Sequence, residues 1–222
     1  SRGKYLVAIS FSRAERAAGA TLPVGFKGQA VGRLAGMPKA VDVKDIKLNV
    51  TSELIDMNAH GVIGPLGASA VFNMPFTAQS GDLAALAKAF DLDSPFGGEV
   101  GFSAVLAGTV DALDLNGVSV QLDNDFGRFG LNGRVASLGP DAELELDIDV
   151  AVPDLARLGP VLDWPLDQYL GVGLSGRAKL LREEGQLRLS GVDGKINGKG
   201  IRSSRFFGQL PDLTDLASGS IT

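Results

Sequence analysis

The most regular pattern in the chain is a strict alternation of apolar and polar residues over positions 142–152. The apolar members are Ala142, Leu144, Leu146, Ile148, Val150 and Val152, and between them stand Glu143, Glu145, Asp147, Asp149 and Ala151. Successive side chains of a strand point to opposite faces, so this pattern predicts a strand with one apolar and one solvated face. The apolar face needs a cover of some kind.

Short helix signals follow two of the predicted strands. Ser80 can cap a helix that runs through Phe90, which makes about three turns at most. A second helix is predicted over 153–158, where Pro153-Asp154 opens the run and Gly159-Pro160 stops it. Two helices of this length are too short to cover the apolar face of a long sheet.

After each helix the chain returns to strand patterning. Alternating residues predict strands over 100–106, 113–122 and 129–135, and again over 172–180. The strand at 113–122 changes phase at Asn116-Gly117, so one residue is inserted beside a glycine. This is typical of a β-bulge, which bends a strand and keeps the same face apolar on both sides of the bend.

Three segments of the chain begin almost identically, which indicates an internal repeat. They are Val24-Gly25-Phe26, Val100-Gly101-Phe102 and Val172-Gly173-Leu174, at spacings of 76 and 72 residues. We therefore predict an all-β fold with one short helix per repeat, in a single elongated domain of three tandem repeats. Their approximate bounds are 1–66, 67–138 and 139–222.

Tandem antiparallel strands extend a sheet sideways, and about four strands per repeat would make it roughly 55 Å long. We expect such a sheet to curve into a groove lined by its apolar face. A closed sandwich or barrel would bury the same side chains and produce the same alternation, so it stays the alternative.

Composition excludes several classes of protein. The 222 residues are 45% apolar and include no Cys, which excludes disulfide scaffolds, thiol catalysis and zinc fingers. A pI of about 4.9 without a Lys/Arg cluster argues against a nucleic-acid partner. No apolar run approaches the roughly 18 residues of a spanning helix. Because the first residue is Ser, we interpret the chain as a fragment of a longer protein.

The motifs that could carry catalysis have simpler explanations. Residues 171–176 match the G-x-G-x-x-G pattern of dinucleotide sites, yet they begin a predicted strand where that mechanism needs a helix N-terminus. His60, the only His, is interpreted as a surface residue of a strand. The chain has no G-x-S-x-G elbow either. We predict that this protein is not an enzyme.

Acidic residues could suggest a metal site or a glycosidase pair. Asp147 and Asp149 lie on the predicted solvated face, where charge needs no further role. Asp123 and Asp125 flank an Asn before Gly127 and are better explained by an Asx turn than by a calcium loop. We therefore predict no metal and no cofactor. Trp164 is expected to pack under the helix that precedes it.

Three segments of the chain together resemble the repeat of the AsmA-like family of bacterial envelope proteins. They are residues 153–162, Val172-Gly-Leu-Ser-Gly-Arg and Gln186-Leu-Arg-Leu-Ser-Gly-Val. That family is related to the repeating β-groove, bridge-like lipid transfer proteins. The resemblance implies a periplasmic groove in a Gram-negative bacterium, anchored in the inner membrane by a segment outside this chain. It also implies phospholipid transport toward the outer membrane, in support of outer-membrane lipid homeostasis.

The resemblance and the alternation together predict which residues face the lipid. The predicted groove lining is Phe102, Leu106, Leu115, Val120, Phe129, Leu131, Leu144, Leu146, Ile148, Val150, Leu174 and Leu189. Phospholipid or another acyl-chain lipid is the expected partner, and envelope proteins could be further partners. The alternative function is a structural or protein-interaction β module of the envelope with a closed core.

Overall fold

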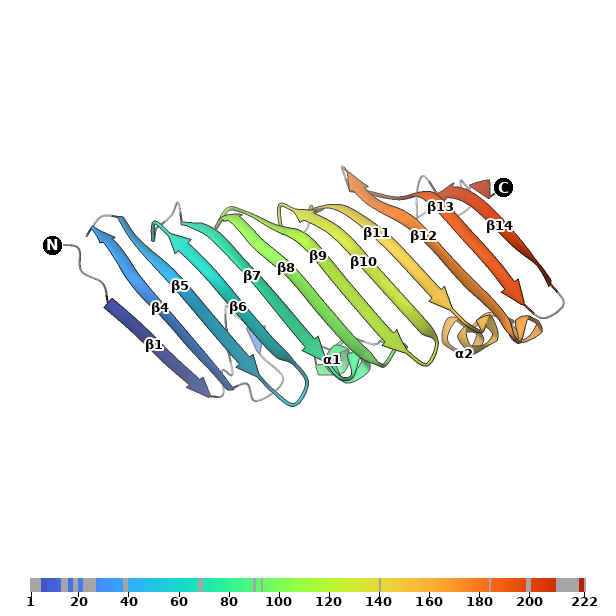
Figure 1. Ribbon diagram of the computed structural model, residues 1–222, viewed down its shortest axis with the longest axis horizontal. Coiled ribbons are helices and arrows are strands. Elements are labelled where there is room, and N and C mark those ends of the chain that lie inside the picture. The colour runs from blue at the N-terminus through green and yellow to red at the C-terminus, as the bar shows by residue number, and fades with distance from the viewer. Residues whose placement is uncertain are drawn as a thin grey trace. The chain divides into compact units, whose positions relative to one another are not determined.

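The fold is known from a computed structural model (Figure 1). It describes residues 5–12, 16–17, 20–21, 27–37, 40–67, 70–89, 91–92, 94–139, 141–183, 185–198, 201–210 and 220–221. The predicted repeat start at Val24-Gly25-Phe26 lies outside these ranges.

Antiparallel strands dominate the described residues, as the alternation predicted. Eleven strands, β4 to β14, follow one another in chain order in a single open sheet, which β1 and β15 extend at its two edges to a total of 13. The strands up to the first helix are β1 (Tyr5–Ser12), β2 (Arg16–Ala17), β3 (Ala20–Thr21), β4 (Lys27–Met37), β5 (Ala40–Thr51), β6 (Asp56–Gly64) and β7 (Val71–Ser80). Those after it are β8 (Glu99–Thr109), β9 (Ala112–Asn124), β10 (Gly127–Ala136), β11 (Glu143–Val152), β12 (Val172–Glu183), β13 (Gln186–Gly198), β14 (Ile201–Leu210) and β15 (Ser220–Ile221).

The sheet is not closed. Its hydrogen-bonded order begins at β1 and ends at β15, and these two strands are not paired with each other. Strands β2 and β3 form a separate two-stranded sheet. The closed-barrel alternative is therefore wrong for the described strands. The chain divides into two compact units, residues 1–118 and 119–222, called the N-terminal and the C-terminal unit below.

The helix of the N-terminal unit, α1 (Leu83–Ala89), begins two residues later than a Ser80 cap would give. Its cap is Asp82, whose Oδ1 accepts hydrogen bonds from the backbone N–H groups of Ala84 (2.9 Å) and Ala85 (3.3 Å). The Ser80 hydroxyl instead bonds the backbone of Asp82 in the turn before the helix. Ser and Asp are both common helix caps, and the Ser80 side chain is already used in the turn that precedes the helix, so Asp82 is the cap. Phe90 lies outside the described residues.

The helical insert of the C-terminal unit has three parts: η1 (Leu155–Leu158), α2 (Gly159–Leu162) and η2 (Asp167–Tyr169). Asp154 caps it as predicted and accepts from the N–H of Ala156. The first helical turn, η1, ends at Leu158 as predicted, but Gly159-Pro160 then begins α2 instead of ending the helical insert, because proline in the first turn of a helix loses no intrahelical hydrogen bond. The turn ends at Asp163, in the left-handed region at φ 54°.

The same bulge geometry recurs along the sheet. In β5, Asp45 and Ile46 together stand opposite Gly32 of β4, and in β13, Gly191 and Val192 stand opposite Ala178 of β12. The first bulge residue is left-handed in both, with φ of 53° at Asp45 and 59° at Gly191. Gly117, where the sequence predicted a bulge, is also left-handed at 58°. Asp45, Gly117 and Gly191 are 72 and 74 residues apart, and the predicted repeat stays a prediction.

Within the part of each unit that the structure describes, burial gives no sign of a second layer over the apolar face. Among the described residues no large side chain is less than 2% exposed. In the C-terminal unit the most buried apolar residues are Val152 (2%), Val172 (4%) and Leu158 (8%), which lie at or beside the helical insert. The insert therefore covers the strand ends. Along the middle of β11, Ile148 and Val150 are only half-buried.

Gly133 of β10 gives a test of the sheet register. Its φ is +154°, and a Cβ there would overlap the carbonyl oxygen of Glu145 in β11. We expect Gly133→Ala to lower the free energy of unfolding by about 1–3 kcal/mol, measured by urea denaturation.

The matched control is Gly130→Ala in the same strand. A Cβ at Gly130 would meet its nearest atom at 3.6 Å, an ordinary contact, and its φ is not left-handed. We expect this variant to be unchanged or stabilised by about 0.5–1 kcal/mol. Equal losses in the two variants would contradict the register of β10 against β11.

Candidate functional site

The register brings most of the predicted lipid-facing residues onto one face. In the C-terminal unit Phe129 stands opposite Val150, and Leu131 stands opposite Ile148. Residues directly opposite each other in antiparallel strands share a face. The same cross-strand pairing continues from β11 to β12 and from β12 to β13. Phe129, Leu131, Leu144, Leu146, Ile148, Val150, Leu174 and Leu189 all lie on this side. We call it the apolar face of the unit.

In the N-terminal unit, β7 and β8 carry the corresponding apolar face. Phe102 stands opposite Ala78 and Leu106 opposite Met74. The rings of Phe76 and Phe102 lie 5.3 Å apart between centroids and tilt by 35°. The two remaining predicted residues, Leu115 of the N-terminal unit and Val120 of the C-terminal unit, lie on β9 and are half-buried. Whether any of the twelve residues contacts a lipid stays a prediction.

The opposite side of the C-terminal unit is a polar face built on β11. Its acids stand between basic residues of the flanking strands, since Arg134 lies opposite Glu145 and Lys179 opposite Asp147. Lys179 Nζ lies 2.9 Å from Glu145 Oε1 and 3.9 Å from Asp147 Oδ1. The hydrogen bond to Glu145 and the two negative charges raise the pKa of Lys179. Asp147 and Asp149 are exposed on this face, as predicted.

A second ion-pair cluster lies farther along the polar face, where Asp193 of β13 holds two arginines. Arg205 donates from Nε to Oδ1 and from Nη2 to Oδ2, both at 2.7 Å. Arg177 donates from Nη2 to Oδ2 at 3.3 Å, and the Arg205 guanidinium lies 4.9 Å from the ring centre of Phe207. The hydrogen bond from Arg205, together with the charges of both arginines, outweighs burial and lowers the pKa of Asp193.

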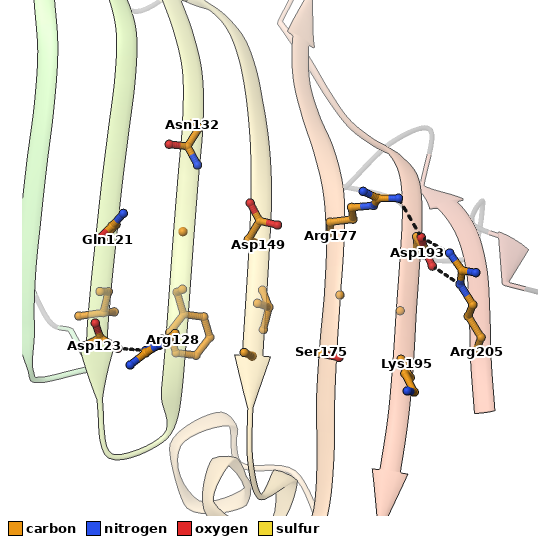
Figure 2. Close-up of a pocket in the computed structure, with 17 residues that line it drawn as sticks. Gln121, Asp123, Arg128, Asn132, Asp149, Ser175, Arg177, Asp193, Lys195 and Arg205 are labelled. Atoms are coloured by element: carbon orange, nitrogen blue, oxygen red, sulfur yellow. Dashed lines mark hydrogen bonds and ion pairs between the residues drawn. The ribbon is translucent and has the colours of Figure 1, made fainter. Parts of the chain in front are cut away.

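The polar face of the C-terminal unit is hollowed beside this cluster. Figure 2 shows the hollow, whose volume is about 870 Å³ and whose lining comes from β9 to β14. One cross-strand row runs through it in the order Arg128, Ala151, Ser175, Lys195 and Arg205. The two small residues in the middle of that row, Ala151 and Ser175, form the floor of the hollow. This site leaves no signal in the sequence, because its residues come from six strands and each strand shows only ordinary polar positions.

The candidate acidic and histidine sites do not form reactive clusters. Asn124 Oδ1 accepts from the N–H groups of Phe126 (2.9 Å) and Gly127 (3.1 Å), which is the predicted Asx turn. Asp123 pairs with Arg128 at 2.8 Å. His60 is exposed on β6, as predicted for a surface residue. No group of three or more His, Cys, Asp or Glu residues suited to a metal ion is found within the described ranges.

Trp164 departs from its prediction. Its side chain is 62% exposed, so it does not pack under the preceding helix. The backbone N–H of Trp164 donates to the carbonyl of Gly159 in α2 (3.0 Å), after the left-handed turn at Asp163, while its side chain stays exposed. Among the described residues, no helix combines the length and apolar character that crossing a membrane requires.

The Asp193 cluster predicts a pH dependence of stability. A carboxylate whose pKa is lowered by folding stabilises the native state above its unfolded pKa of about 3.9, and loses this effect as the pH falls through its native value. We expect Asp193→Asn to be less stable than the wild type at pH 7 in chemical denaturation. The difference in free energy of unfolding between the wild type and the variant should narrow steadily below about pH 4. A difference that does not change with pH would contradict the ion pairing of Asp193 with the two arginines.

Comparisons with profiles of known families, with curated proteins and with solved structures find no match to the chain. The resemblance to the AsmA-like family, carried by residues such as 153–162, therefore stays a prediction.

Proposed function

We propose that this chain is one section of a conduit that carries phospholipids between the inner and outer membranes of a Gram-negative bacterium. Acyl chains lie against the apolar face, and no catalytic residue takes part. This function follows from the resemblance to the AsmA-like family, and it would place the chain in the periplasm, where it contributes to outer-membrane lipid homeostasis.

One observation supports the proposal above the others: large side chains along the apolar face are only half-buried. Phe129, Leu131, Ile148 and Val150 form two facing pairs across β10 and β11, and each is half-buried. A protein that needed this face only for folding would be expected to cover it with a second layer. Half-exposed aliphatic side chains in long rows suit a ligand that is itself hydrocarbon.

The energetics agree with a hydrocarbon ligand. Each methylene group that an acyl chain moves from water onto such a face contributes roughly 0.8 kcal/mol. Apolar contacts are non-directional, so a chain can slide along the face without breaking specific bonds. A strand of 10 residues such as β11 spans roughly 33 Å, whereas one acyl tail reaches about half of a bilayer core, roughly 15 Å. The head group would remain in water beside the face.

Phe102→Glu tests this proposal in the N-terminal unit. A carboxylate on the apolar face must either lose its hydration or exclude the acyl chain. We expect phospholipid with a photoactivatable acyl chain to crosslink to the variant at least tenfold less than to the wild type. Native mass spectrometry of the purified protein should show the same loss of co-purified phospholipid.

The matched control is Thr77→Glu, which adds the same charge to the polar face of the neighbouring strand β7. It should crosslink like the wild type. Leu106→Gln provides a milder change on the apolar face, and circular dichroism checks that each variant is folded. Equal crosslinking of the Phe102 and Thr77 variants, or a wild type free of lipid, would favour the structural module instead.

A further inference from the structure

Leu122, Phe129 and Val150 contribute to the lining of the hollow, and its polar side chains are of two kinds. The first kind is already paired. Figure 2 shows Arg177 and Arg205 directed at Asp193, and Arg128 at Asp123. Two arginines share the single carboxylate of Asp193, so that cluster keeps one net positive charge. All of these groups already have partners within the chain.

The second kind has no hydrogen-bond or ion-pair partner within the described part of the chain. It comprises Gln121, Asn132, Asp149, Ser175 and Lys195, which all line the hollow. Each comes from a different strand, in the order β9, β10, β11, β12 and β13. Neighbouring strands lie about 4.8 Å apart, so the five side chains span roughly 19 Å across the sheet. We call them the polar track.

The floor of the hollow leaves room for a ligand along this track. Ala151 and Ser175 stand directly opposite each other between Arg128 and Lys195, and Gly130 stands opposite Asp149. The resulting volume of about 870 Å³ is in the range of sites that hold a drug-sized molecule, about 300–1,000 Å³. Apart from Ala151 and the glycines, the residues of this face that line it are polar or charged. The side chains that this face presents suit a ligand that is mostly polar.

The chemistry of the polar track narrows the class of ligand. Gln121 and Asn132 can each donate and accept, Ser175 can do both, and Asp149 accepts only. This combination suits hydroxyl groups, which also donate and accept. Lys195 is the one cation of the track, and it stands opposite Ser175 on one side and Arg205 on the other. It would be the contact for a carboxylate of a ligand that is otherwise rich in hydroxyl groups.

We propose that the polar face of the C-terminal unit binds an acidic saccharide chain, with Lys195 contacting one of its carboxylates and Gln121, Asn132 and Asp149 contacting its hydroxyl groups. This site lies on the side of the sheet opposite the apolar face. It is therefore independent of lipid transport, and one lipid could not place its tails on the apolar face and its head group in the hollow.

Isothermal titration of the 222-residue chain with three probes tests the proposal. The probes are trigalacturonate, the neutral sugar maltotriose and the acidic peptide triglutamate. We expect saturable binding of trigalacturonate and at least tenfold weaker binding of the other two. Backbone amide shifts in NMR spectra should change along β9 to β13.

Single-residue variants test which side chains contact the saccharide. Lys195→Gln should reduce the affinity for trigalacturonate to that for maltotriose, and Asn132→Ala should weaken the binding of both sugars. Lys47→Gln is the matched control, because Lys47 is an exposed lysine of β5 in the N-terminal unit. It should bind like the wild type.

Three results would each overturn the proposal. They are no binding of trigalacturonate, triglutamate binding as tightly as trigalacturonate, or equal losses in the Lys47 and Lys195 variants. The last two would show attraction by net charge alone. None of these results depends on whether the apolar face carries lipid.

Discussion

Cross-strand register is the constraint on which every other feature of this protein depends. Side chains alternate with a period of two, so a shift of one residue would move a whole apolar row to the solvated side. The pairing of Leu131 with Ile148, and of Leu180 with both Leu146 and Leu189, holds the rows in phase over four strands. An apolar face and a polar face are both consequences of this one alignment.

The bulges preserve that alignment where the strands would otherwise lose it. At Asp45-Ile46 and Gly191-Val192 two residues of one strand stand opposite one residue of the next, so the apolar pattern continues beyond the bulge with its phase corrected. The residue opposite each bulge is small, Gly32 or Ala178. At the first bulge the space is already filled, because a Cβ on Gly32 would lie 3.0 Å from the Val43 side chain.

The two faces of the C-terminal unit suit different partners for a simple physical reason. On the apolar face the side chains have no polar groups to satisfy, so a sliding hydrocarbon chain suits it. On the polar face, charges such as those of Asp193 and Arg205 satisfy each other, and their neighbours Asp149 and Lys195 have no ion-pair partner within the described residues. Those two side chains can bond to solvent or to a ligand, and fixed, directional contacts of this kind favour binding in one place.

The sequence by itself determined the strands, the helical inserts and the side of each strand that is apolar, because these are local properties. Alternation over 142–152 is readable without knowing any neighbour, and so is the Asx turn at Asn124. Local patterns predicted helix ends less well where more than one residue could begin or end the helix. Asp82 rather than Ser80 caps α1, and Gly159-Pro160 continues a helical insert that it was expected to end.

Only the tertiary structure decided that the sheet stays open, that Trp164 is exposed, and that a hollow forms on the polar face. Each of these depends on which strands are neighbours and in what register. Asp193 lies 12 residues from Arg205 and 16 from Arg177 along the chain, and no local pattern marks the three as one cluster. Pairing across strands brings them together, and pairing is a property of the whole sheet.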